Sequence, residues 1–494
     1  MSELTNESIL NLQKAFVTAS PRISPRVTPW FSHIIHLVVL ACSIAIFARV
    51  FFSAGIFAWS AGLAYVFYDT ALLIFVAWQT LPLLNLAILY PPLSSIVSNV
   101  RPTVGVIIAA YNEVEVLERT IGALLAQNDP PDQILIADDG STDGTAALLN
   151  EVYGFALPEA LPNSHLTHSN VLSSANYSQL RWLHATHGGK ARTLNQAINQ
   201  LNADIVITVD ADTLLAENAI AVMRNAFATE PALVAATGVL TPVCSNKLTG
   251  KFLQWFQTYE YIRNFISRFA WMQVDSLLLL SGAFAGYRRK ELVAVGGFDP
   301  DCLVEDYELT HRLRRYAVEH KLDWQVRVLG GAQARTSAPS TFGGFLLQRR
   351  RWFAGFLQTQ YWNRDMIGNS RFGRLGMLML PVKTLDTVQP FYGLFAFLFL
   401  IIFVASGKLT LLTSVFIVIG SKILIDLAFH LWSIYLYRRW TGDRSQSKFS
   451  LAIAAAILEP FSFQLLRHTG AVMGWFYFIT GRQGWGKQQR HQID

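Results

Sequence analysis

The sequence predicts an α/β domain enclosed between membrane-spanning helices. The chain of 494 residues is 52% hydrophobic but only 15% charged, whereas soluble domains usually carry about 25% charged residues. Its apolar residues concentrate at the two ends, and the middle, about 100–370, has an ordinary globular composition. In that middle part, short β-branched apolar runs alternate with segments of helical periodicity. Such alternation is typical of a mostly parallel sheet covered by helices on both faces.

The first apolar stretch is long enough for two membrane spans. Between Phe31 and Leu93 the only formally charged residues are Arg49 and Asp69, and about 20 apolar residues cross a bilayer. Its length and the polar residues before it exclude a cleavable signal peptide. We therefore predict a cytosolic segment at 1–31 and two spans within 32–93, roughly 32–53 and 59–88.

A second apolar region, 375–480, follows the middle domain. Its apolar segments are 375–406, 409–437 and 449–480, and a basic tail at 481–494 ends the chain. Basic residues favour the cytosolic side. They precede the first span (Lys14, Arg22 and Arg26) and follow the fourth (Arg438-Arg439), which places the N-terminus and the middle domain in the cytosol. The last segment allows one crossing, or a short hairpin broken at Glu459-Pro460 that keeps the tail inside; we favour the hairpin.

The middle domain is expected to follow a strand–helix order. The predicted strands are Val104–Ala109, Gln133–Ala137, one that opens at Leu183, and Ile205–Val209; the predicted helices between them are Glu115–Ala126, Thr142–Val152 and Ala191–Asn199. A polar insert at about 158–180 is predicted to be a loop.

Acidic residues follow three of these strands. Glu113, Asp139 and the pair Asp210 and Asp212 come where strands end, and ligands of parallel sheets bind at the carboxyl ends of strands. Grouped carboxylates repel one another unless a cation or a proton intervenes. An Asp-x-Asp after a buried strand suits Mg²⁺, which takes one or two carboxylates together with water and phosphate oxygens. Turn capping explains one such residue, but it explains the whole set poorly.

Two later sequence segments also contain candidate functional residues. Glu305-Asp306 opens a predicted helix at Tyr307–Tyr316, where capping is the simpler role and a neighbouring acid raises the basicity of the other. The string from Gln348 to Trp352, QRRRW, lies between apolar residues of the segment 340–374. A basic amphipathic helix on anionic lipid accounts for the segment as a whole. It does not account for Gln348 and Trp352, whereas arginine forks suit a diphosphate and a Trp face suits a sugar.

Together these residues resemble the processive family 2 membrane glycosyltransferases, which include the cellulose, chitin, hyaluronan and poly-N-acetylglucosamine synthases. The resemblance covers about 100–370 and follows the family order D, D-x-D, E-D and Q-x-x-R-W: here Asp139; Asp210 and Asp212; Glu305-Asp306; Gln348, Arg351 and Trp352. Further matches are Tyr111-Asn112-Glu113 to a uridine-contacting motif, Lys190 to a G-K element, Ser281-Gly282 to the segment before the acceptor site, and, loosely, Trp485-Gly486-Lys487 to the tail of hyaluronan synthases.

This resemblance implies a GT-A (Rossmann-like) glycosyltransferase domain at 100–339, a UDP-sugar donor, Mg²⁺ or Mn²⁺, and inversion at the anomeric carbon. It implies that Asp306 is the catalytic base and that Asp212 and Asp210 hold the metal. It assigns the donor to Tyr111, Glu113, Asp139, Lys190, Asp210, Gln348 and Arg351, and the acceptor to Trp352 and Glu305.

The expected function is that of a hexosyltransferase that polymerises sugar from a UDP-sugar into an extracellular polysaccharide and moves the chain across the membrane. Polar residues inside membrane segments mark cavities or ion pairs, and both fit the ten in the last helices: Lys383, Asp386, Gln389, Lys422, Asp426, His430, Glu459, Gln464, Arg467 and His468. The alternatives are transfer of one sugar to a membrane lipid, as in ceramide glucosyltransferases, and a protein that only senses nucleotide. A Rossmann dehydrogenase is disfavoured because no G-x-G-x-x-G follows the first strand.

The expected location is the bacterial inner membrane, with the catalytic domain in the cytosol. The expected partners are the UDP-sugar, the growing glycan, membrane lipids and accessory export subunits. A net charge of +6 is too small to indicate nucleic acid as a partner.

Overall fold

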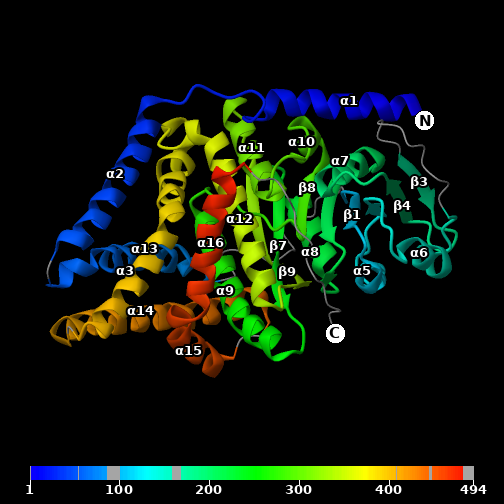
Figure 1. Ribbon diagram of the computed structural model, residues 1–494. Helices are drawn as coiled ribbons and strands as arrows, with labels where there is room; N and C mark the ends of the chain where they lie inside the picture. Colours follow the sequence, from blue (N-terminus) through cyan, green and yellow to red (C-terminus); the bar gives the residue numbers. More distant parts are fainter. Residues whose placement is uncertain are drawn as a thin grey trace.

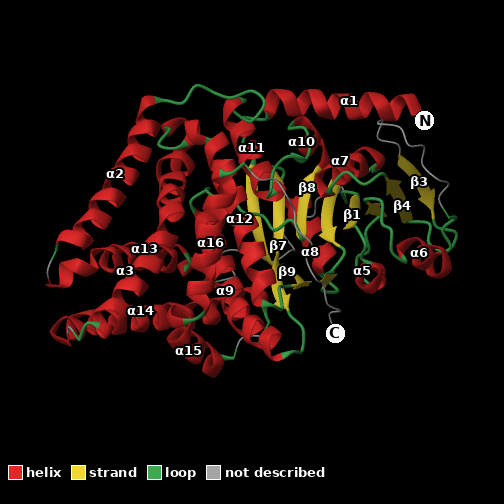
Figure 2. Cartoon of the chain, in the orientation of Figure 1, coloured by secondary structure: helices red, strands yellow, loops and turns green. Residues whose placement is uncertain are grey.

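The computed structural model describes residues 2–53, 55–85, 101–157, 169–407, 409–443 and 448–481. A mixed α/β sheet with surrounding helices forms one side of the molecule, and long apolar helices gather on the other side (Figures 1 and 2). The tail motif at Trp485-Gly486-Lys487 lies outside the described residues.

The sheet has nine strands in the order β3-β4-β2-β1-β5-β8-β7-β9-β6. In chain order the strands are β1 (Val104–Ala110), β2 (Gln133–Asp138), β3 (Ser169–Ser173), β4 (Leu180–Ala185), β5 (Ile205–Asp210), β6 (Thr213–Leu215), β7 (Leu233–Val243), β8 (Phe284–Arg288) and β9 (Gln325–Ser337). Strands β4, β2, β1 and β5 are parallel, whereas β8 runs antiparallel to both β5 and β7. The sheet is therefore mixed, and its parallel part is the predicted strand–helix alternation.

The prediction of a loop at 158–180 was wrong in part. Ser169–Ser173 forms strand β3, which pairs antiparallel with β4. This strand lies at the edge of the sheet, so it has one partner and needs no continuous apolar run of the kind that marks central parallel strands. Strand β4 also begins at Leu180, before the predicted Leu183.

Helices of the sheet domain begin where the sequence changes period. They are α5 (Val114–Leu125), α6 (Thr145–Tyr153), α7 (Lys190–Gln200), α8 (Ala219–Thr229), α9 (Leu248–Gln273), α10 (Arg289–Ala294), α11 (Glu305–Glu319) and α12 (Phe342–Trp362). The predicted helices match α5, α6 and α7 within a few residues. Because α7 begins at Lys190 and α11 at Glu305, two predicted site residues stand at helix starts.

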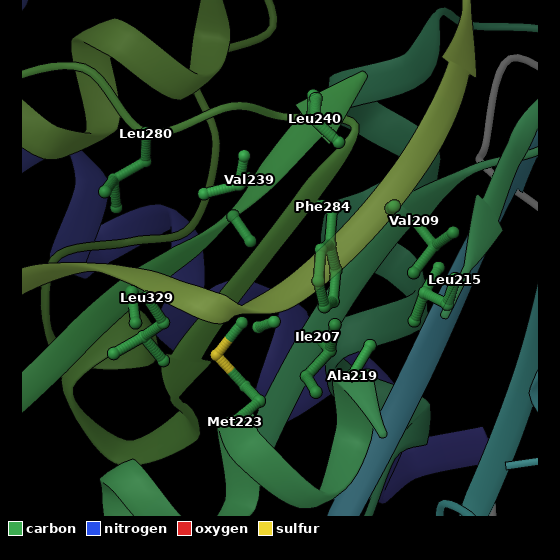
Figure 3. Packing of buried hydrophobic residues seen from close by; sticks show 14 of the residues in the cluster. Ile207, Val209, Leu215, Ala219, Met223, Val239, Leu240, Leu280, Phe284 and Leu329 are labelled. Atoms are coloured by element: carbon green, nitrogen blue, oxygen red, sulfur yellow. The ribbon is translucent and has the colours of Figure 1, made fainter. Parts of the chain in front are cut away.

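The core of the domain fixes the sheet against these helices. Figure 3 shows side chains of β5, β7 and β8 meeting α8, among them Ile207, Phe284 and Met223. All three are fully buried. Gly238 on β7 allows this packing, since a Cβ there would come within 2.3 Å of the Phe284 ring. Close packing of this kind holds the ends of β1, β2 and β5 in fixed relative positions.

Long apolar helices confirm an integral membrane protein. Among the described residues, four helical stretches are long and apolar enough to span a membrane: Trp30–Phe52, Gly55–Gln79, Leu375–Ala405 and Thr410–Thr441. They contain α2 (Trp30–Phe52), α3 (Ser60–Gln79), α13 (Leu380–Ala405) and most of α14 (Leu409–Thr441). The pair α15 (Phe449–Leu458) and α16 (Phe463–Ile479) is bent by 48° and would make a fifth span if it crosses as one. Its break contains the predicted Glu459-Pro460.

Helix α16 runs beside α12. At its start Phe463 packs against Phe345 in a tilted arrangement, and near its end Phe478 meets Tyr361, with ring centroids 5.0 and 6.3 Å apart. Gly470 makes the close approach, because a Cβ there would lie 2.6 Å from the Cβ of Arg349. The helix that carries QRRRW is therefore packed against the last apolar helix.

The N-terminal segment is attached to the sheet domain. Helix α1 (Ser2–Ala19) lies along the domain near α10 and α7 (Figure 1). After it, Arg22 pairs with Asp299 at 2.9 Å and Arg26 with Glu319 at 3.1 Å. The segment before the first span thus lies on the same side as the sheet domain, as the basic residues predict.

Candidate active site

All eleven predicted site residues line one cavity. Its volume is about 1810 Å³, and it lies at the ends of β1, β2 and β5. Its wall includes Tyr111, Glu113, Asp139, Lys190, Asp210, Asp212, Glu305, Asp306, Gln348, Arg351 and Trp352. The structure therefore brings together groups that span some 240 positions of the sequence.

Lys190 links two of the acidic motifs. Its Nζ lies 2.6 Å from Asp210 Oδ1 and 3.3 Å from Glu305 Oε1. Burial disfavours the charged amine, but Asp210 and Glu305 outweigh that effect and raise the pKa of Lys190. The lysine therefore stays charged and holds the end of β5 against the start of α11.

Asp306 is held in place by backbone groups. Its Oδ2 accepts a hydrogen bond from the Gly282 N–H at 2.7 Å, and its Oδ1 accepts one from the Tyr307 N–H at 2.8 Å. Burial and the neighbouring Glu305 raise the pKa of Asp306, against the opposing effects of these N–H groups and Lys190. A carboxylate with a raised pKa that faces a cavity is a suitable general base.

Asp139 organises the loop before α7. Its two oxygens accept hydrogen bonds from the N–H groups of Gly188 and Gly189 and from the Thr193 hydroxyl at 2.7–3.2 Å. A carboxylate offers about four lone-pair sites, and these bonds use most of them. The geometry gives Asp139 a loop-holding role; its predicted contact with the donor stays a prediction.

His187 belongs to the cavity although the sequence analysis did not single it out. Its ring stacks on Tyr111, with centroids 4.3 Å apart and planes 20° from parallel. Its Nδ1 also lies 2.9 Å from Asp139 Oδ2. The signal that could have found it is its position directly before Gly188-Gly189-Lys190. The exposed pair of rings offers a flat surface on which a planar nucleobase can stack.

Helix α12 supplies the other wall. Gln348 is buried, and its Oε1 has no hydrogen-bond partner among the described residues. Arg351 donates to the Leu303 carbonyl at 3.1 Å, which ties α12 to the loop before Glu305. The guanidinium of Arg349 lies 4.5 Å from the centre of the Trp352 ring and pairs with Glu260 at 2.7 Å. Trp352 is thereby fixed from one side.

The two aspartates of the Asp-x-Asp motif suit a hard cation. Asp210 ends β5, and the buried Asp212 follows it in the turn to β6. Among the described residues, no three His, Cys, Asp or Glu side chains are grouped to hold a metal by themselves. A site with one or two carboxylates fits Mg²⁺, which takes its remaining ligands from water and substrate phosphates.

The cavity continues between the apolar helices. Its far wall contains five of the ten predicted polar residues, Lys383, Asp386, Gln389, Arg467 and His468. Three others, Lys422, Asp426 and Gln464, line a separate cavity of about 90 Å³ that shares His468. For Asp426 the structure shows the ion-pair alternative: it lines this smaller cavity and pairs with Lys422, which also binds Asp69.

Ion pairs account for most of the charges in the bundle. Lys383 pairs with Asp386 at 2.7 Å, and Glu459 pairs with Arg263 at 2.6 Å. The sequence left two roles open for the ten polar residues, ion pairing and cavity lining, and the structure shows both. Of these pairs, Lys383 and Asp386 line the cavity and offset each other's charge there.

Comparison with known sequences identifies the family. The model of "Glycosyl transferase family 2" matches residues 105–296, and that of "Glycosyl transferase family group 2" matches residues 205–438. The chain belongs to glycosyltransferase family 2. These matches confirm the family predicted from the motifs and, with the mixed sheet, a GT-A-like domain flanked by apolar helices.

The relatives of this family 2 transferase include polysaccharide synthases. The chain is 26% identical over 305 residues to the poly-beta-1,6-N-acetyl-D-glucosamine synthase of Staphylococcus epidermidis, and 30% identical over 251 residues to that of Staphylococcus aureus (strain COL). The alignments cover 61% and 50% of this chain, and 66% and 53% of the relatives. They thus span less than two thirds of each relative's own length.

A solved structure of similar shape is the mannosyltransferase of Pyrobaculum calidifontis, in complex with GDP-Man and Mn²⁺. It is 19% identical with a TM-score of 0.49, and the superposition covers 87% of this chain and 99% of that one.

Proposed function

We propose that this family 2 transferase is an inverting, processive synthase that polymerises sugar from a UDP-sugar and passes the product into the membrane bundle. The names of its relatives make UDP-N-acetylglucosamine the first donor to test. The observation that carries the proposal is the continuous cavity, which joins the residues around Asp306 to polar side chains of α13 and α16. A chain that grows at Asp306 has a polar path to follow.

The reaction is a direct displacement at the anomeric carbon. Asp306 takes the proton of the acceptor hydroxyl while that oxygen attacks the anomeric carbon, and the bond from this carbon to the diphosphate oxygen breaks. UDP leaves with the bonding electron pair. Attack from the face opposite to the leaving group inverts the configuration.

The donor is held by cationic and amide groups. Lys190 and Arg351 line the cavity from α7 and α12, and Gln348 adds a buried amide to the same lining. Arginine forks bind diphosphate oxygens well. A Mg²⁺ or Mn²⁺ ion held by Asp212, with Asp210 beside it, would neutralise charge that develops on the leaving diphosphate. The stacked rings of Tyr111 and His187 would bind the uracil ring of the donor.

The acceptor side is built around Trp352. One face of its ring is covered by Arg349, and Trp352 lines the same cavity as Lys383. A terminal sugar stacked there stays next to Asp306 between additions. Retention of the product is the physical requirement of processive synthesis.

The proposed topology places both ends of the last helix pair at the cytosolic side. Near its start, the Leu451 carbonyl accepts a hydrogen bond from Trp255 Nε1 of α9, and near its end Phe478 meets Tyr361 of α12. Helices α9 and α12 both belong to the sheet domain. These contacts support the hairpin that keeps the tail inside.

The test is a donor screen with product sizing. Purified protein is incubated with labelled UDP-N-acetylglucosamine, UDP-glucose or UDP-glucuronate and Mg²⁺, and the products are separated by length. We expect one donor to give UDP release together with long glycan. A product that consists only of a lipid with one sugar refutes the processive proposal. Absence of UDP release with all three donors refutes the proposed transferase activity.

A further inference from the structure

Among the described residues, Arg268 is a cation of the cavity wall that has no carboxylate within 4.0 Å. Arg268 lies on α9 and lines the cavity. In contrast, four other basic side chains of the wall each lie within 4.0 Å of a carboxylate: Lys190, Arg349, Lys383 and Arg467. Within the described part of the chain, Arg268 instead donates from its Nη1 to the Ser281 hydroxyl at 2.7 Å.

Most hydrogen-bonding capacity of Arg268 is unused. Its Nε is buried without a partner among the described residues, and a guanidinium carries five N–H donors. Burial lowers the pKa of Arg268 to about 10, which still leaves it charged at neutral pH. A buried charge without an ion-pair partner is costly, and a ligand that supplies oxygen acceptors to the unused N–H groups reduces this cost.

The position of Arg268 is fixed relative to Asp306. The Ser281 hydroxyl binds Arg268, and the next residue, Gly282, donates its N–H to Asp306. The guanidinium also lies over the Phe265 ring at 4.5 Å from its centre, which sets its plane. Arg268 and the proposed base are thus anchored to consecutive residues of one loop.

The wall around Arg268 belongs to the acceptor end of the cavity. Trp271, three positions later on α9, lies in the same hydrophobic cluster as Tyr307, and Trp352 packs against this cluster. Lys190 and Asp210, which belong to the proposed UDP-sugar site, form an ion pair with each other. Arg268 therefore lines the cavity beside the loop that holds Asp306 and near the cluster against which Trp352 packs.

We propose that Arg268 is an acceptor-binding residue that donates hydrogen bonds to hydroxyl or acyl oxygens of the terminal glycan sugar and so positions the attacking hydroxyl at Asp306. This inference rests on the proposed function, and it adds a residue that no motif of the sequence contains. Because the contact is made to the acceptor, its loss should weaken acceptor binding and leave donor binding unchanged.

The experiment compares acceptor and donor kinetics of the full-length protein in detergent. R268Q is assayed with a short N-acetylglucosamine oligosaccharide as acceptor and with the donor that wild type uses. We expect the acceptor KM to rise roughly ten- to hundredfold, as for a lost hydrogen bond to a charged group. The donor KM should stay within about twofold of wild type. The slow hydrolysis of the UDP-sugar, measured as UDP release without a glycan acceptor, should also stay within about twofold.

Two further variants keep the test decisive. K251Q removes an exposed lysine from the same helix and should behave as wild type. S281A retains the guanidinium but frees it from its anchor, so its acceptor KM should rise less than that of R268Q. If R268Q does not bind UDP and is therefore judged to be unfolded, the acceptor KM of S281A decides the test.

An unchanged acceptor KM in the folded variant overturns the inference, and so does a rise confined to the donor KM. Wild-type protein that transfers no sugar from any donor instead refutes the proposed function, so the two failures are distinguishable.

Discussion

Replacement of Asp306 by Asn tests the proposed base while nearly keeping its shape. The two carboxylate oxygens hold the N–H groups of Gly282 and Tyr307 at 2.7 and 2.8 Å. An amide has one acceptor oxygen, so one of these N–H groups loses its partner at a cost of about 1–3 kcal/mol. Loss of the base lowers turnover by roughly 10²–10⁴. We therefore expect a folded, slightly less stable protein with nearly normal UDP affinity.

The assay combines UDP release, UDP binding by calorimetry and thermal unfolding. D306N should bind UDP within a few-fold of wild type and show the stated loss of turnover. Turnover of more than about a tenth of wild type, in a variant that still folds, would show that Asp306 only positions the loop and would refute the reasoning.

The pH profile provides a second test of the same group. Burial and Glu305 raise the pKa of Asp306, and a general base acts only when ionised. Activity should therefore fall as the pH decreases through this raised value, at higher pH than for an exposed aspartate. E305Q removes the neighbouring negative charge and should move that acidic limb to lower pH. An acidic limb that does not move in E305Q would contradict the assignment.

Three further substitutions address the metal, the ion pairs and the acceptor. D212N should abolish transfer in Mg²⁺ or Mn²⁺ and weaken metal-dependent UDP binding; wild-type turnover in a chelator would contradict a metal role. K190M leaves Asp210 and Glu305 without the lysine between them. The free energy of unfolding should therefore fall by about 2 kcal/mol, less than the roughly 3–5 kcal/mol expected when a fully buried ion pair is broken, and the donor KM should rise. An unchanged melting temperature and donor KM would exclude the role of Lys190 as a bridge. W352A should shorten the product more than it weakens donor binding, whereas W352F keeps an aromatic face and should retain most of the length; equal product length in both would exclude stacking.

Much of the fold was predictable because the local pattern and the final structure agree. The helix after β1 and the helix at Lys190 begin where the sequence changes period, and the apolar stretches match the long helices. The edge strand β3 was missed since its polar residues are typical of a loop. The antiparallel β8 was missed because its place between β5 and β7 depends on pairing across long sequence distances.

The candidate site was predictable where residues form ordered motifs. Asp306 and Trp352 stand in motifs, and the cavity contains both. Arg268 lies in no motif, and its lack of an ion pair among the described residues exists only in the packed structure. Asp426 shows the converse case: a polar residue in an apolar helix indicates burial against protein, but its partner Lys422, not the sequence position, decides whether it lines the main cavity.

The central claim is that synthesis at Asp306 is coupled to entry of the glycan into the bundle. The most direct measurement uses sealed vesicles with the sheet domain outside, labelled donor added outside, and digestion with a matching glycosidase before and after detergent. We predict long product that resists digestion until the vesicles are opened. Long product that is digested fully in intact vesicles, or product limited to one sugar on lipid, would contradict it.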